Sequence, residues 1–254
     1  MTFSIALSGK GGVGKTNISA LLIRQLCERG RVLAIDADPD SNLPQALGVT
    51  VRKSVGEVRE SVMNRAAAQG IEADKGLKIF EKNLHNLVEE TERFDLVVMG
   101  RPEGEGCYCA INHIIRQVID TRAKGYDFTV IDCEAGLEHL SRRTTADLSL
   151  MIIVTDPTLY GLMAAKRIGE ISRELLINFG QILMVANKIT CETRDYFEKM
   201  ARENGLEIDE YIPYAPEIAN LDASGGSIFE LPANSEAFIT VEKLCRHIPM
   251  LHTS

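Results

Sequence analysis

Short apolar runs alternate with amphipathic segments along most of this chain. The runs have the length and the β-branched content of buried strands, and we predict strands at residues 3–7, 32–35, 94–99, 128–132, 150–154, 182–186 and 207–212. Apolar residues at helical spacing follow in residues 18–26, 110–118 and 235–248. This alternation predicts an α/β fold with a mostly parallel central sheet and helices on both faces. No repeat or Pro/Gly/Ser-rich linker divides the sequence, so we expect residues 1–254 to form a single domain.

Residues 51–93 depart from this alternation because they are charged and helix-prone throughout. We expect helices here that decorate the core domain, with Arg52, Lys53, Arg59 and Arg65 on a solvated face. The segment has no catalytic pattern, and the sequence leaves open whether it binds a partner.

The hydrophobic content, the net charge and the length of the apolar runs limit the class of protein to which this chain can belong. The chain has 254 residues with 45% hydrophobic content, enough for a substantial core. A net charge of −8 argues against broad binding to nucleic acids or anionic membranes, although a local basic patch stays possible. The first predicted strand begins at Phe3, which leaves no room for a signal peptide, and the longest apolar run, 148–154, is too short to span a bilayer. We therefore expect a soluble, cytoplasmic protein with no nucleic-acid or membrane partner.

A phosphate-binding motif lies between the first strand and the first helix. Residues 9–16 read Gly-Lys-Gly-Gly-Val-Gly-Lys-Thr, which fits glycine, four residues, then Gly-Lys-Ser/Thr. A strand, a glycine-rich turn and a helix amino terminus together direct backbone N–H groups at a polyphosphate. Lys15 is predicted to reach the β- and γ-phosphates, and the Thr16 hydroxyl to ligate Mg²⁺. The predicted nucleotide-binding residues of this segment are Gly11, Gly12, Val13, Gly14, Lys15, Thr16 and Asn17.

Carboxylates follow two of the predicted strands. Asp36 and Asp38 are two residues apart, so both project to one face while the strand persists, and Asp132 ends the strand at 128–132. Acidic residues often end strands, and Asp-Pro often begins a turn. Behind a phosphate loop, however, carboxylates are needed to hold Mg²⁺ and the attacking water. We therefore predict a magnesium site formed by Thr16, Asp36 and Asp132.

A second possible metal site is the Cys107-Tyr108-Cys109 segment. Two cysteines supply two thiolate ligands, whereas a closed thiolate site normally has four. A two-fold dimer doubles every ligand at its axis, so two copies of the pair complete such a site. Taken alone, the pair is more simply a disulfide or two structural cysteines. The metal site depends on a dimer that brings the pairs together.

Lys10, directly after the first glycine of the loop, makes the motif resemble the deviant Walker A class of ATPases, which includes MinD, ParA, the nitrogenase iron protein and CooC-type proteins. The resemblance implies a P-loop NTPase fold of this type, ATP-driven dimerisation and slow hydrolysis. It also implies that Lys10 contacts the partner's nucleotide, that Asp38 orients the attacking water, and that Asn187 and the loop at Pro213 lie beside the adenine. Lys15-Thr16-Asn17 departs from the usual Lys-Thr-Thr, for which we expect altered affinity and not lost function.

Three segments together resemble the nickel-insertion ATPases of the CooC type: the Asp-Pro-Asp-Ser of 38–41, the cysteine pair, and the Asp-x-x-Ala-Gly-x-Glu-His-Leu of 132–140. The resemblance implies ATP or ADP and Mg²⁺ as ligands, Ni²⁺ or Zn²⁺ at Cys107 and Cys109, a nucleotide- and metal-dependent homodimer, and carbon monoxide dehydrogenase or acetyl-CoA synthase as the client. Two alternatives stay open, a MinD/ParA-like positioning ATPase without metal and an iron–sulfur redox ATPase. The Cys-x-Cys spacing is tighter than the second alternative suggests.

Overall fold

The computed structural model describes residues 2–82, 87–101, 123–134, 148–174 and 179–248. Its strands are β1 (Phe3–Gly9), β2 (Val32–Ala37), β3 (Glu89–Glu90), β4 (Asp95–Val98), β5 (Phe128–Cys133), β6 (Leu148–Thr155), β7 (Phe179–Ile189) and β8 (Glu210–Pro213). Its α-helices are α1 (Lys15–Leu26), α2 (Leu43–Leu47), α3 (Val55–Ala68), α4 (Ala73–Lys82), α6 (Leu159–Glu174), α7 (Cys191–Glu203), α8 (Pro216–Ser224) and α9 (Glu236–Leu244). None of the helices in this part of the chain has the length and apolar character that crossing a bilayer requires.

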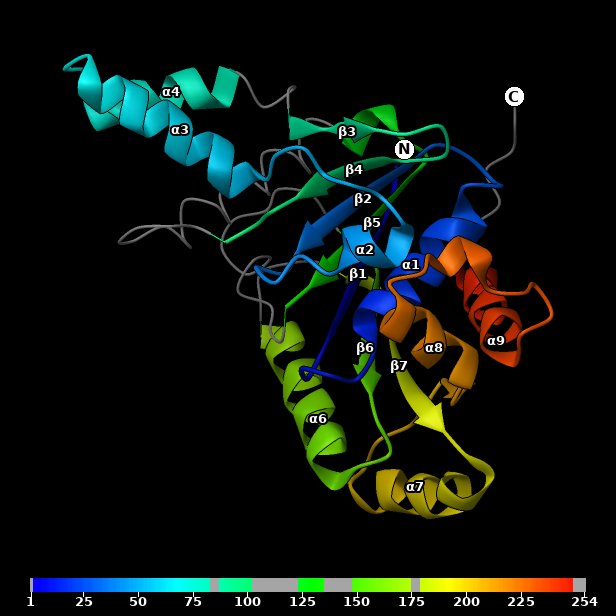
Figure 1. Ribbon diagram of the computed structural model, residues 1–254. Helices are drawn as coiled ribbons and strands as arrows, with labels where there is room; N and C mark the ends of the chain where they lie inside the picture. Colours follow the sequence, from blue (N-terminus) through cyan, green and yellow to red (C-terminus); the bar gives the residue numbers. More distant parts are fainter. Residues whose placement is uncertain (1, 83–86, 102–122, 135–147, 175–178, 249–254) are drawn as a thin grey trace.

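The strands form one eight-stranded sheet in the order β3-β4-β2-β5-β1-β6-β7-β8. Every neighbouring pair is parallel except β3 and β4, which are antiparallel. Because β1 lies between β5 and β6, and β2 lies on the far side of β5, the carboxyl ends of β1, β2 and β5 meet at one edge of the sheet (Figure 1). In α/β sheets, ligands bind at this edge.

Side chains from alternate strand positions enter two separate cores, one on each face of the sheet. Ile5, Leu7 and Val130 pack with α1 and α9 in one core. Ala6 and Ile131 belong to the other, which includes residues of α3, α4 and α6. Both faces are therefore covered, which explains why the central strands are almost continuously apolar.

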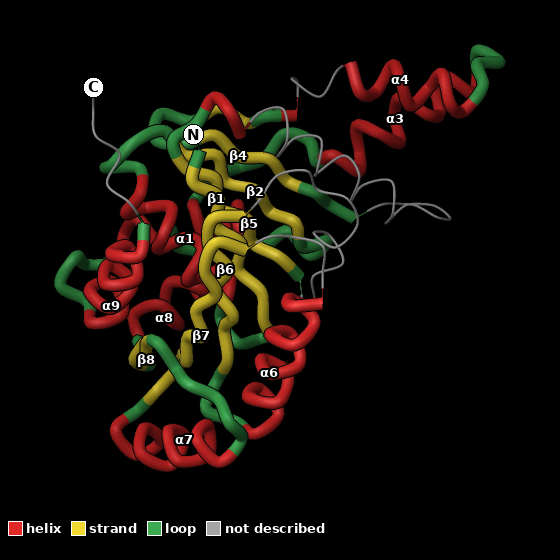
Figure 2. The backbone as a smooth tube through the Cα atoms, turned by 180° about the vertical axis from the view of Figure 1, so that it is seen from behind, coloured by secondary structure: helices red, strands yellow, loops and turns green. Residues whose placement is uncertain are grey.

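The mostly parallel sheet confirms the predicted fold class. Strand β3 was not predicted, because its two residues are both glutamate and lack the apolar character on which strand prediction depends. Helices α3 and α4 do occupy most of residues 51–93, and they extend away from the sheet in both backbone views (Figures 1 and 2). The final helix ends at Leu244, where a 3₁₀ turn over Cys245–His247 follows.

Candidate functional site

The phosphate loop between β1 and α1 has the conformation that its glycines permit. Gly12 and Gly14 have φ of +81° and +92°, in the left-handed region that residues with a Cβ rarely adopt. Helix α1 begins at the next residue, Lys15, so its amino terminus opens at the loop. The Lys15 side chain is only 7% exposed, and its Nζ lies 3.4 Å from the Lys10 carbonyl oxygen. The Lys15 ammonium group therefore lies against the loop, at the position where a phosphate would bind.

Two residues at the end of β7 support this loop from the side. The Asn187 amide donates to the Val13 carbonyl at 2.8 Å, and the Lys188 ammonium donates to the Gly12 carbonyl at 2.8 Å. A Cβ added at Gly14 would lie 2.3 Å from the Asn187 amide nitrogen, so that contact needs glycine. Asn187, predicted as an adenine contact, is thus tied to the phosphate loop, and its adenine contact stays a prediction. Lys188 was missed by sequence reasoning, although its position directly after Asn187 was a usable signal.

The carboxylates Asp36 and Asp132 are register partners on β2 and β5 and lie directly behind the loop. Both are almost wholly buried, at 0% and 1% exposure. Asp132 accepts hydrogen bonds from the Ser19 hydroxyl at 3.1 Å and from Thr16. Burial raises the Asp132 pKa to about 6, against the effect of these hydrogen bonds and of the nearby Lys15. Ser19, one turn after Thr16 on α1, was not predicted, and its signal was a polar residue on an otherwise apolar helix face.

Asp36 organises the loop that follows β2. Its two oxygens accept the backbone N–H groups of Asp38 and Leu43, both at 3.0 Å. Burial, and then the charge of Asp132, raises the Asp36 pKa to about 8. Both Asp36 oxygens thus accept hydrogen bonds from the backbone. The role of Asp36 in binding Mg²⁺ stays a prediction. This arrangement leaves Asp38 half-buried at the mouth of the site.

A cavity of about 740 Å³ lies beside the phosphate loop. One side of it is polar and includes the predicted residues Gly11, Gly12, Gly14, Lys15, Thr16, Asn17, Asp38 and Asn187. The other side is largely apolar and includes Ala46, Ile212, Pro213, Ala215, Ile218 and Ala219. A polyphosphate on the polar side and a flat base on the apolar side would both be accommodated. The amide of Asn17 donates to the Asp222 carboxylate at 2.9 Å and so connects α1 to α8 across this cavity.

Val13, Asp36 and Asp132, which were also predicted for the site, are buried and do not line this cavity. Lys10 is exposed, and its Nζ lies 5.9 Å from the centre of the Tyr160 ring on α6. The structure thus places Lys10 on the outer side of the loop, apart from Lys15.

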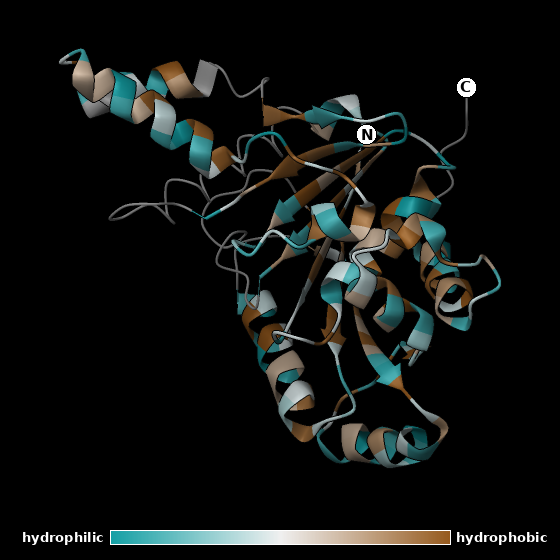
Figure 3. Ribbon diagram, in the orientation of Figure 1, coloured by the Kyte–Doolittle hydropathy of each residue, from teal (hydrophilic) through white to brown (hydrophobic). Residues whose placement is uncertain are grey.

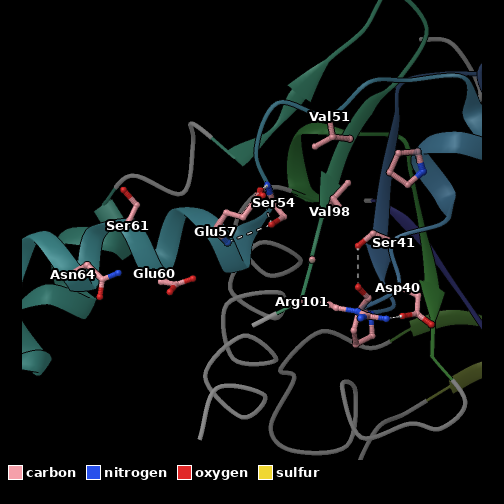
Figure 4. Close-up of a pocket in the computed structure, with 13 residues that line it drawn as sticks. Asp40, Ser41, Val51, Ser54, Glu57, Glu60, Ser61, Asn64, Val98 and Arg101 are labelled. Carbon is pink, nitrogen blue, oxygen red and sulfur yellow. Dashed lines mark hydrogen bonds and ion pairs between the residues drawn. The ribbon is translucent and has the colours of Figure 1, made fainter. Parts of the chain in front are cut away.

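A second cavity, of about 800 Å³, lies where the loop after β2 meets the start of α3 (Figure 4). Asp40 lines both cavities, and its carboxylate forms an ion pair with Arg101, three residues after the end of β4. Figure 4 shows Ser54 and Glu57 on the opposite wall, where the Glu57 carboxylate accepts the Ser54 backbone N–H at 2.7 Å. Within the loop of Pro39–Ser41, Asp40 is thus shared by the two cavities, whereas Pro39 and Ser41 line the second one.

Cys107 and Cys109, the predicted metal ligands, lie outside the described residues. Of the described cysteines, Cys133 and Cys245 are buried, Cys27 is half-buried and Cys191 is exposed. Within the described ranges, no group of three or more His, Cys, Asp or Glu side chains is placed to hold a metal ion. The Cys-x-Cys site stays a prediction from the sequence.

The chain is similar in sequence to known nucleotide-binding proteins. The family model for the CobQ/CobB/MinD/ParA nucleotide-binding domain matches residues 4–228. An uncharacterised ATP-binding protein of Methanocaldococcus jannaschii is 46% identical over 246 residues, covering 96% of this chain and 97% of that protein. The carbon monoxide dehydrogenase accessory protein CooC of Rhodospirillum rubrum is 32% identical over 238 residues, covering 89% of both chains.

Solved structures share the fold. A ParA family ATPase from Chlorobium tepidum superposes with a TM-score of 0.73 at 21% identity, covering 98% of this chain and 100% of that one. The MinD protein of Pyrococcus horikoshii in complex with Mg-ADP gives a TM-score of 0.70 at 22% identity, covering 99% and 97%. At these identities the likeness concerns the fold alone.

Proposed function

Since this chain belongs to the CobQ/CobB/MinD/ParA family of nucleotide-binding domains and is an ATPase of that family, we propose that it is a dimeric maturation factor for a nickel enzyme. In this proposal, Cys107 and Cys109 from each of two subunits hold one metal ion, and ATP hydrolysis is coupled to its delivery. The client would be carbon monoxide dehydrogenase or acetyl-CoA synthase.

The single observation that carries the proposal is the similarity to CooC along 89% of both chains at 32% identity. The cysteine pair adds chemistry that a positioning ATPase has no evident need for. Thiolates bind soft and borderline divalent ions, so Zn²⁺ would compete with Ni²⁺ as cargo.

The cavity has the groups that phosphoryl transfer needs. Lys15 and the amino terminus of α1 would neutralise charge on the β- and γ-phosphates. Thr16 and the buried Asp132 present a hydroxyl and a carboxylate side by side, an oxygen donor set that suits Mg²⁺. When bound there, Mg²⁺ would supply positive charge against the phosphate oxygens.

Asp38 is the residue that we assign to the attacking water. It is half-buried, it lines the cavity, and the hydrogen bond from its backbone N–H to Asp36 fixes the start of its loop. A carboxylate in that place can accept a hydrogen bond from water and orient it toward a γ-phosphate.

The dimer is supported by the surface around Lys10. Leu159, Tyr160 and Met163 at the start of α6 are 51%, 79% and 45% exposed. A cluster of large exposed apolar side chains often marks a surface that binds another protein. A second copy seated here would cover them and bring its Lys10 close to the first copy's phosphate loop.

Anaerobic titration with Ni²⁺ and with Zn²⁺ tests the proposal, with the oligomeric state followed by sedimentation with and without ATP. We expect one metal ion per dimer in the wild type and none in Cys109→Ser. Cys191→Ser is the matched control because it removes an exposed thiol elsewhere, and it should titrate like wild type. One ion per monomer, or no binding, would contradict a metal site shared between subunits, and no binding would favour a positioning ATPase. A visible iron–sulfur chromophore after anaerobic purification would instead favour the redox ATPase.

The hydrolytic assignment has its own test. Asp38→Asn keeps the size of the side chain and should bind ATP with little change while turnover falls about 10²-fold or more. Normal turnover would remove Asp38 from the mechanism.

A further inference from the structure

Helices α3 and α4, here called the arm, project from the sheet and lie against each other (Figures 1 and 2). The arm is attached firmly at one end. Ser54 caps α3 through a capping box with Glu57, and the Gly56 N–H donates to the Met99 carbonyl at 3.0 Å. Val55 is buried in the core beneath the sheet. The rest of α3 therefore leaves the domain in a defined direction.

A groove of about 700 Å³ follows α3 toward the turn into α4. Val58, Val62 and Ala66 are spaced by four residues, so they form one stripe along the helix. Ile71 and Ile79 complete the apolar lining, and Ile79 is 42% exposed. Figure 3 shows apolar and polar colours alternating along both helices. Val58 and Val62 are half-buried and pack partly on the core, and Ala66 is only 4% exposed. The accessible part of the stripe therefore runs from Val58 to Val62, about 6 Å along the helix at a rise of 1.5 Å per residue.

The rim of this groove is basic. Arg52, Lys53 and Arg65 line it together with one acid, Glu57. Arg52 forms an ion pair with Glu89 at 3.4 Å, and the Glu57 carboxylate accepts a hydrogen bond from the Ser54 hydroxyl in the capping box. Within the described residues, neither Lys53 nor Arg65 has a carboxylate within ion-pair distance, and both are exposed. A local positive charge of this kind is notable on a chain whose net charge is −8.

From this combination we propose that the groove binds an acidic amphipathic helix of a partner protein. Two apolar side chains at positions i and i+4 of that helix would pack on the stripe, and carboxylates flanking them would face Lys53 and Arg65. The arm projects away from the sheet, so a partner can bind it without entering the nucleotide cavity. Such binding requires neither the cysteine pair nor any metal.

A defined peptide tests the groove. The probe is a fluorescein-labelled helix of about 14 residues with two leucines four apart and glutamates on both sides. We expect fluorescence anisotropy to show saturable binding to the full chain, weakened at least tenfold in Lys53→Glu/Arg65→Glu. The matched control is Arg173→Glu/Lys199→Glu, which reverses two exposed charges on α6 and α7 and should bind like wild type. ATP turnover should be unchanged in both variants.

Chemical specificity is tested with two altered peptides, one with lysines in place of the glutamates and one with serines in place of the leucines. Both should lose binding, because the first reverses the charges and the second removes the apolar contacts. Methyl NMR should show shifts at Val58, Val62, Ile71 and Ile79 when the acidic probe is added.

Several results would overturn the proposal: no binding of the acidic probe, equal binding by both charge-reversal variants, or methyl shifts confined to other parts of the chain. So would a change of oligomeric state in Lys53→Glu/Arg65→Glu, which would show that a second copy covers the groove. Binding of phosphatidylserine vesicles in place of the peptide would indicate a membrane surface instead.

Discussion

In the nucleotide cavity, the polar side chains around the phosphate loop form hydrogen bonds with residues from distant parts of the chain. In the arm, by contrast, the polar side chains line an open groove. Asn187 and Ser19 are 9% and 0% exposed, and each donates to a named partner. Lys53 and Arg65, in contrast, are exposed on the rim. Catalysis requires groups fixed before the substrate arrives, while an interaction surface can be ordered by its partner. The following predictions test this difference.

The largest effect is expected at Lys15. Lys15→Ala removes the buried ammonium beneath the phosphate loop, so we expect ATP turnover to fall by about 10²–10³-fold, the range for losing one preorganised electrostatic contact. Steady-state phosphate release measures this. Lys199→Ala, an exposed lysine on α7, should retain full turnover, and a wild-type rate in Lys15→Ala would contradict the assigned site.

A pair of glycine substitutions compares the two regions directly. Gly14 and Gly70 both have positive φ, +92° and +68°, but an added Cβ meets the Asn187 amide at 2.3 Å in the first case and nothing within 4 Å in the second. Gly70→Ala should lower the free energy of unfolding by about 1–2 kcal/mol through backbone strain alone. Gly14→Ala should cost more, because the clash adds to the strain. Chemical denaturation of the nucleotide-free protein measures both, and equal losses would show that the contact with Asn187 is unimportant.

The buried carboxylates predict a pH dependence that the arm lacks. The Asp36 pKa is raised to about 8 by burial and by Asp132, against about 3.9 in an unfolded chain. Between these values the folded protein keeps a proton that the unfolded chain releases, so stability is lost as the pH rises. The slope for one such group is at most about 1.4 kcal/mol per pH unit.

Urea unfolding in EDTA at intervals from pH 5 to pH 7.5 checks this. The free energy of unfolding should decrease across the range, and Asp36→Asn should show a shallower slope. A free energy that rises over the same interval would contradict the assignment to Asp36.

The smallest effect is expected at the start of the arm. Ser54→Ala removes the hydroxyl that accepts the Glu57 backbone N–H at 3.3 Å, and loss of an N-cap costs about 1 kcal/mol. Thermal unfolding measures the loss. Nucleotide affinity should not change, because the capping box is local to α3. Reduced ATP binding would show that the two regions are coupled through the loop of Pro39–Ser41.

The sequence by itself determined the fold class and the phosphate loop. Both depend on local signals: buried parallel strands are continuous apolar runs, and a phosphate loop needs its glycines, lysine and threonine at fixed spacing. The same holds for Asp36 and Asp132, because each ends a recognisable strand.

Only the tertiary structure decided which distant residues complete the site. Ser19 meets Asp132 across 113 residues, and Lys188 meets Gly12 across 176. Such contacts are set by strand order and register, which no local pattern encodes. The groove of the arm is of the same kind: the sequence showed its charged residues on a solvated face, but only the packing of α3 on α4 brought Lys53 and Arg65 to the rim of one apolar stripe.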